Sequence, residues 1–235
     1  ADLLYRLTML RPHPLSLGLT LLLFSFLIRA PKKLKELWPV FLIAALLAWL
    51  HISLAWVMAG VALVIAGTRL LMTRKLHWRP LLTVATGGAL GWLLRPNPFG
   101  AAKLAYIQVV ELMRVKQQMI PLRFGRELSP FVWENFVDQL LPLAILLILA
   151  AGFLLSLIRS GKFKTLADEV KTGIMSGLAL TVTFLMMTFG VARRSNELLV
   201  GFGIIFIALI FTLFLRQGNA RSPARTLTIL IAFIT

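Results

Sequence analysis

Four basic side chains interrupt or end apolar stretches of the chain: His51, Arg95, Arg193 and Arg194. Arginine binds phosphate well because its guanidinium offers parallel N–H donors, and a histidine can donate to a phosphate or a sugar. Arg95 stands directly before Pro96-Asn97-Pro98, and the two adjacent arginines lie in a tight connection between apolar runs. These residue types indicate a site for an anionic headgroup or a lipid phosphate.

Each of these residues also has a plainer interpretation. His51 could be a hydrated histidine at a membrane interface, and Arg95 could reach the interface along its aliphatic stem. Arg193 and Arg194 could form a local ion pair with Glu197. Asn97, held between two prolines, could offer its amide to a ligand or only shape a turn. The sequence leaves these alternatives open.

Four of the nine acidic residues lie in one polar interval of 44 residues, 95–138. A carboxylate there could serve as a general base or a metal ligand, and Glu127 is the catalytic candidate. For each of the four, a solvated or salt-bridged carboxylate is the alternative; they are Glu111, Glu127, Glu134 and Asp138. No spacing of His, Asp and Glu forms a metal motif. The sequence therefore identifies no cofactor and no ligand motif for a divalent metal.

The composition is that of a membrane protein. Hydrophobic residues make up 59% of the 235 residues and charged residues only 14%, against roughly 25% charged in a soluble domain. The mean hydropathy is +0.86. The apolar runs are continuous rather than alternating, which argues against a membrane barrel and predicts an all-α polytopic helix bundle. The chain has no cysteine, which excludes disulfides and thiol chemistry.

We expect one integral membrane domain over residues 1–235. The last apolar run is shorter than the roughly 20 residues of a span, and the chain starts at Ala1 without methionine, so we expect missing sequence at both ends. Gly87, Gly88 and Gly91 lie on one helix and predict close helix packing. The expected spans are about 14–28, 38–50, 52–68, 80–94, 139–158, 173–192, 198–215 and 226–235.

The net charge of +16 is distributed as a topology signal rather than as a nucleic-acid surface. If residues 38–68 cross twice with a turn at His51, four basic clusters in short loops fall on one side, which the positive-inside rule makes cytoplasmic. One long tilted helix over 38–68 is the alternative, but the hairpin explains the charges better. The clusters hold 15 of the 25 basic residues and lie at 29–35, 69–79, 159–171 and 216–225.

The opposite side then holds His51, the loop 95–138 and the turn with two arginines. Residues 101–119 of this loop can form an amphipathic helix suited to the membrane interface, with Lys103 and Glu111 on its polar face. Pro130 is expected to start a short helix. These segments are therefore expected on the outer side of the membrane.

Short outer turns and one long outer loop on a multi-span bundle resemble the GT-C glycosyltransferases, and in particular a group of uncharacterised bacterial GT-C-like membrane proteins. The resembling elements spread over about 150 residues. In order, they are His51, Pro96-Asn97-Pro98, Gly125-Arg126-Glu127-Leu128-Ser129-Pro130 and Arg193-Arg194-Ser195-Asn196-Glu197. The resemblance implies a donor sugar linked to polyprenyl phosphate and a location in the cytoplasmic membrane of a bacterium.

The resemblance also implies a reaction in which an acceptor hydroxyl displaces lipid phosphate from the anomeric carbon of the sugar. Arg193, Arg194 and Arg95 would stabilise the departing phosphate, and a carboxylate would deprotonate the acceptor. The family's catalytic carboxylate is expected in the first outer loop, where this chain has only Asp2. The chain would then be a fragment that lacks the N-terminal catalytic part.

A non-catalytic membrane subunit or scaffold of a larger complex is the alternative function. Almost no ionisable residue lies within the expected spans, which argues against an ion or proton pathway. The expected partners are membrane lipids, a polyprenyl-phosphate sugar and other membrane subunits, and not nucleic acid. In an enzyme the outer arginines should converge on a cavity open to lipid, whereas in a scaffold they should be spread apart.

Overall fold

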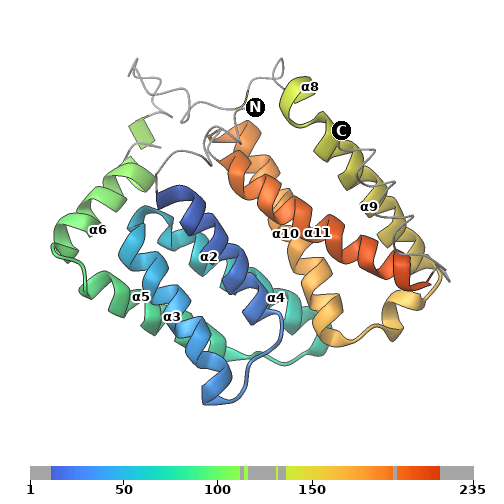
Figure 1. The fold of residues 1–235 in the computed structure, drawn as a ribbon, viewed down its shortest axis with the longest axis horizontal. Helices are drawn as coiled ribbons and strands as arrows, with labels where there is room; N and C mark the ends of the chain where they lie inside the picture. Colours follow the sequence, from blue (N-terminus) through green and yellow to red (C-terminus); the bar gives the residue numbers. More distant parts are fainter. Residues whose placement is uncertain (1–11, 112–113, 116–130, 132–135, 193–194, 218–235) are drawn as a thin grey trace. The chain divides into compact units, whose positions relative to one another are not determined.

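The computed structural model describes residues 12–111, 114–115, 131, 136–192 and 195–217. These residues form helices and no strand, so the predicted all-α fold is confirmed for this part of the chain (Figure 1). The chain separates into two compact units, Ala1–Ser129 and Pro130–Thr235, here called unit 1 and unit 2. The single domain expected from the sequence stays a prediction.

Unit 1 contains a break at His51, which ends one helix and precedes a 3₁₀ turn. The structure therefore has two helices over residues 38–68, which is the alternative that the charge pattern favours. The elements of unit 1 are α2 (Pro12–Leu27), α3 (Leu34–Leu50), η1 (Ile52–Leu54), α4 (Ala55–Thr73), α5 (Trp78–Leu93), α6 (Pro98–Tyr106) and the π-helical turn η2 (Ile107–Glu111).

Helices α3 and α5 lie side by side and run parallel (Figure 1). A Cβ atom built on Gly87 would lie 2.5 Å from the carbonyl oxygen of Phe41, and one built on Gly91 would lie 2.0 Å from that of Ala45. Glycine is required at both positions because the two backbones approach too closely for a side chain. The predicted packing role of these glycines is confirmed.

Helix α4 runs back toward the end of α2, and Arg69 joins them. Its Nη2 donates to the carbonyl oxygen of Ile28 at 2.8 Å and to that of Leu27 at 3.5 Å. Arg69 is buried, at 5% exposure. The prediction that Arg69 belongs to a loop cluster is wrong, because α4 continues to Thr73 and the guanidinium satisfies carbonyl groups at the end of α2, which have no partner within that helix.

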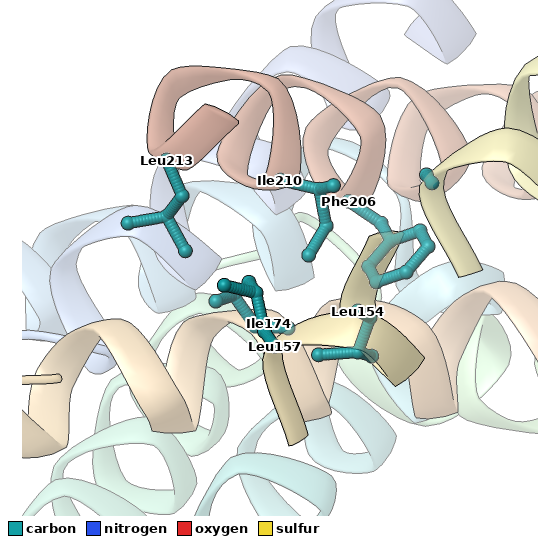
Figure 2. Packing of buried hydrophobic residues seen from close by; sticks show 7 residues of the cluster. Leu154, Leu157, Ile174, Phe206, Ile210 and Leu213 are labelled. Atoms are coloured by element: carbon teal, nitrogen blue, oxygen red, sulfur yellow. The ribbon is translucent and has the colours of Figure 1, made fainter. Parts of the chain in front are cut away.

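Unit 2 is built around α11, which packs against both α9 and α10. Figure 2 shows its core, in which leucine and isoleucine side chains of the three helices lie together with Phe206. Phe184 of α10 also stacks on Phe202 of α11, with ring centroids 5.6 Å apart. The elements of unit 2 are α8 (Phe136–Gln139), α9 (Leu141–Arg159), η5 (Lys162–Thr165), α10 (Asp168–Gly190) and α11 (Asn196–Gln217).

Within the described part of the chain, four helices are long and apolar enough to cross a membrane, and Pro14–Leu27 is a shorter apolar helix. Helix α10 begins at Asp168, earlier than the span expected over 173–192, because Asp168 and Glu169 suit the positive end of a helix dipole. The expected span over 226–235 lies outside the described residues. The four candidates are Ile52–Thr73, Leu141–Arg159, Asp168–Gly190 and Asn196–Leu215. The chain is an integral membrane protein.

Candidate functional site

The candidate site in unit 1 is built on the last turn of α3. Arg95 Nη1 donates to the carbonyl oxygen of Ala48 at 3.1 Å and also to that of Trp49. The last carbonyl groups of a helix lack partners within it and carry its negative dipole end, so a guanidinium is well placed there. Nε and Nη2 of Arg95 make no hydrogen bond to a described residue.

His51 lies beside this contact, as the residue that caps α3. Its Nδ1 lies 3.4 Å from Oγ of Ser16, near the start of α2. Ser16 is fully buried, at 0% exposure, while His51 is half-buried. Sequence reasoning missed Ser16 because a lone serine in an apolar run carries no signal for its partner.

The turn after Arg95 is fixed by Trp92 and Asn97. Trp92 Nε1 donates to the carbonyl oxygen of Pro98 at 2.6 Å, and the Trp92 ring meets Phe99 edge to face. The side chain of Asn97 accepts a hydrogen bond from the backbone N–H of Gly100 at 2.9 Å. Asn97 is thus the N-cap of α6, and Pro98 occupies its first turn. An Asn-Pro pair at these positions is a helix-start signal that the sequence already carried.

Replacing Asn97 with alanine should destabilise the start of α6 by about 1 kcal/mol, because the first N–H groups of the helix lose their acceptor. Hydrogen exchange of the α6 amides should then be roughly fivefold faster. Asn97→Asp keeps a carboxylate acceptor and should exchange as slowly as the natural protein. Equal protection in the alanine variant would contradict the capping role.

The amphipathic helix expected over residues 101–119 differs in the structure. The α-helix starts earlier, at Pro98, and gives way at Ile107 to the π-helical turn η2, which ends at Glu111. A π turn has more residues per turn than an α-helix, so it shifts the following side chains off the expected stripe. Tyr106, the last residue of α6, is 53% exposed.

The sequence predicted further site residues in the segments 125–138 and 193–197. Glu127, Glu134, Arg193 and Arg194 lie outside the described residues, as does the start of the helix expected at Pro130. The structure does place Phe131, whose backbone N–H donates to the carbonyl oxygen of Thr188 at 2.9 Å. Its ring meets Phe189 with centroids 5.6 Å apart.

Phe131 and the residues that it contacts are close in sequence to two of the predicted elements, the segment 125–130 and the turn with Arg193 and Arg194. Phe131 directly follows the segment 125–130, and Thr188 and Phe189 stand near the end of α10, just before the Arg193-Arg194 turn. Phe131 and the end of α10 are therefore in contact within unit 2.

No group of three or more His, Cys, Asp or Glu side chains that could hold a metal ion occurs among the described residues. Glu111 is exposed in η2, and the helix α8 contains Asp138. The described residues of the site offer hydrogen-bond donors to an anion. Arg95 supplies the positive charge.

Comparison of the chain with protein-family models, with curated proteins and with solved structures finds no match.

Proposed function

We propose that the chain is a membrane protein of the glycosyltransferase type, which binds a polyprenyl-phosphate-linked sugar at the outer face of a bacterial cytoplasmic membrane. The supporting observation is that elements far apart in the sequence meet in pairs. Arg95, before the Pro-Asn-Pro turn, contacts the end of α3 next to His51. Phe131, after the Glu127 segment, contacts the end of α10.

The chemistry of Arg95 fits the phosphate of such a donor. Nη1 is held by two helix carbonyl oxygens, which fixes the plane of the guanidinium. The remaining donors, Nε and Nη2, lie on another edge of that plane and can bind a phosphate oxygen each. His51 would add a further donor from the same end of α3.

In the proposed reaction an acceptor hydroxyl attacks the anomeric carbon of the sugar. The new bond joins the acceptor oxygen to that carbon, the bond from carbon to phosphate oxygen breaks, and the lipid phosphate leaves. A carboxylate takes the hydroxyl proton; Glu127 is the candidate in this chain. Arg95 would stabilise the negative charge on the departing phosphate. The resemblance gives Arg193 and Arg194 as further candidates for this role.

Binding of polyprenyl monophosphate to the purified full chain tests this function. Arg95→Gln keeps an N–H donor for the α3 carbonyl groups but removes the charge, and should weaken binding by about tenfold or more. Arg95→Lys keeps the charge and should lose less. Lys162→Gln, at an exposed position in η5, should bind as the natural protein does.

The thermal unfolding midpoint of each variant separates binding from folding. If Arg95→Gln lowers the midpoint and leaves binding unchanged, Arg95 is only a helix cap and the proposal fails for this residue. The same assay on the double variant R193A/R194A tests the two arginines that follow α10 in the sequence. This variant should also bind polyprenyl monophosphate more weakly. Transfer of a labelled sugar from its polyprenyl phosphate then tests for catalysis.

A non-catalytic membrane subunit is the second candidate. The observation in its favour is that Arg95 already has a structural task, since its Nη1 caps α3. This candidate predicts stability losses without any change in lipid-phosphate binding, so the same pair of measurements distinguishes it.

A further inference from the structure

At the end of unit 1 opposite His51, two loops that are distant in the sequence lie together. Arg69 holds the first of them by the carbonyl oxygen of Ile28, at 2.8 Å. Arg79, at the start of α5, donates from Nη1 to the carbonyl oxygen of Lys32 at 3.4 Å. The segments 28–33 and 74–79 are therefore brought to one surface.

This end carries seven exposed cationic side chains, here called the basic surface: Arg29, Lys32, Lys33, Lys35, Arg74, Lys75 and Arg79. None of the seven forms an ion pair with a carboxylate that the structure describes. So many like charges repel one another unless anions from outside the chain accompany them.

Glu36 is the only carboxylate within these two segments and the first turn of α3. Its Oε2 accepts hydrogen bonds from the backbone N–H groups of Lys32 at 2.9 Å and Lys33 at 3.2 Å. These bonds, the one from Lys32 first, lower the pKa of Glu36 below its usual value. Glu36 is engaged in starting α3, so it leaves most of the surrounding positive charge uncompensated.

Apolar side chains are exposed among the cations. Leu34 is 83% exposed, Leu76 55% and Trp78 57%. Leucine and tryptophan beside lysine and arginine suit the boundary between headgroups and acyl chains, where both kinds of side chain find partners. A soluble anion would bind the charges but would leave these apolar side chains in water.

We propose that the basic surface binds the headgroups of anionic phospholipids, with Leu34, Leu76 and Trp78 inserted between the lipids. Seven cations drawn from two loops meet the negative phosphates of one leaflet, and each cation near such a surface strengthens binding by roughly fivefold. The two bonds from Arg69 and Arg79 are what combine the loops into a single surface.

The test is titration of fluorescent phosphatidylglycerol, with phosphatidylcholine for comparison, into the full chain in an uncharged detergent. Phosphatidylglycerol should bind more tightly, and the preference should weaken as salt is raised. The double variant R74N/K75Q should lose about 25-fold in affinity for phosphatidylglycerol. Asparagine suits position 74 because the backbone there is left-handed, with φ 56°.

The matched control is K103Q/R114N, which removes two cations outside the basic surface and should keep the affinity. The double variant K32Q/K35Q removes two cations from the other loop of the basic surface. It should lose as much affinity for phosphatidylglycerol as R74N/K75Q does. Because two variants test the same surface, a folding defect in one of them does not decide the result. Equal binding of the two lipids, or an equal loss in the control, would overturn the proposal. Displacement of the lipid by inorganic phosphate, but not by chloride of the same ionic strength, would also overturn it, since the ligand would then be a soluble anion.

Discussion

Replacing Gly91 with alanine should lower the free energy of unfolding by about 3 kcal/mol, because the added methyl group forces two helix backbones apart. The Cβ atom would stand 2.0 Å from the carbonyl oxygen of Ala45 and 2.7 Å from its carbon. These are backbone atoms in the middle of α3, so no rotamer change can relieve the overlap. Unfolding of the purified chain by SDS, followed by circular dichroism, measures the loss.

Gly60→Ala is the matched control for this prediction. Gly60 lies within α4, and nothing lies within 4 Å of a Cβ atom built there. The same substitution should therefore leave stability unchanged or raise it by up to about 1 kcal/mol, since alanine restricts the unfolded chain and favours the helix. If both variants lost equal stability, the close contact of α3 and α5 would not be the cause.

Replacing Arg69 with methionine should cost roughly 2 kcal/mol of stability, because the carbonyl groups of Leu27 and Ile28 lose their charged donor. Methionine has nearly the length and flexibility of the arginine stem, so packing around it should be preserved. These carbonyl groups lie at and just past the end of α2, where no following turn of that helix supplies a donor. The carbonyl oxygen of Leu27 also accepts from the backbone N–H of Ala30 at 3.2 Å. The shift of the thermal midpoint and of the SDS midpoint measures the effect.

Arg69→Lys provides the comparison for charge alone. Lysine keeps the cation but offers a compact ammonium in place of the planar fork, so it should recover part of the stability. Arg74→Asn, a few residues further on in an exposed position, should have little effect on unfolding. A methionine variant as stable as the natural chain would mean that the cost of burying the guanidinium cancels what its hydrogen bonds contribute.

Much of the helical framework was predictable from local sequence. Continuous apolar runs predicted the helices because a backbone in lipid must satisfy its own hydrogen bonds. The break at His51 followed from the positions of the basic clusters. The boundaries were less well predicted: α4 continues past residue 68 to Thr73, and α10 starts at Asp168. Charged residues at helix ends were the reason, since hydropathy assigns them to loops.

The candidate site was predictable only as a set of residue types. The pattern brought His51 and Arg95 to the same side of a bundle, and the structure places Arg95 on the turn that His51 ends. The local sequence does not predict the contact between Arg95 and Ala48, because the two residues are 47 positions apart in the chain. The N-cap role of Asn97 was local and could have been inferred from the proline that follows it.

The sequence by itself determined that this is a helical membrane protein, where its helices lie, and which loops carry the positive charge. Composition, the continuous apolar runs and the positions of the charges decide these properties, because each property concerns one segment and its solvent. Only the tertiary structure decided what Arg69 and Arg95 do and which backbone Gly91 approaches. Their partners are the backbone carbonyl groups of a neighbouring helix, which every residue carries alike, so no residue type marks them in advance. Packing of the helices selects which carbonyl groups receive a donor and which backbones come close enough to require glycine.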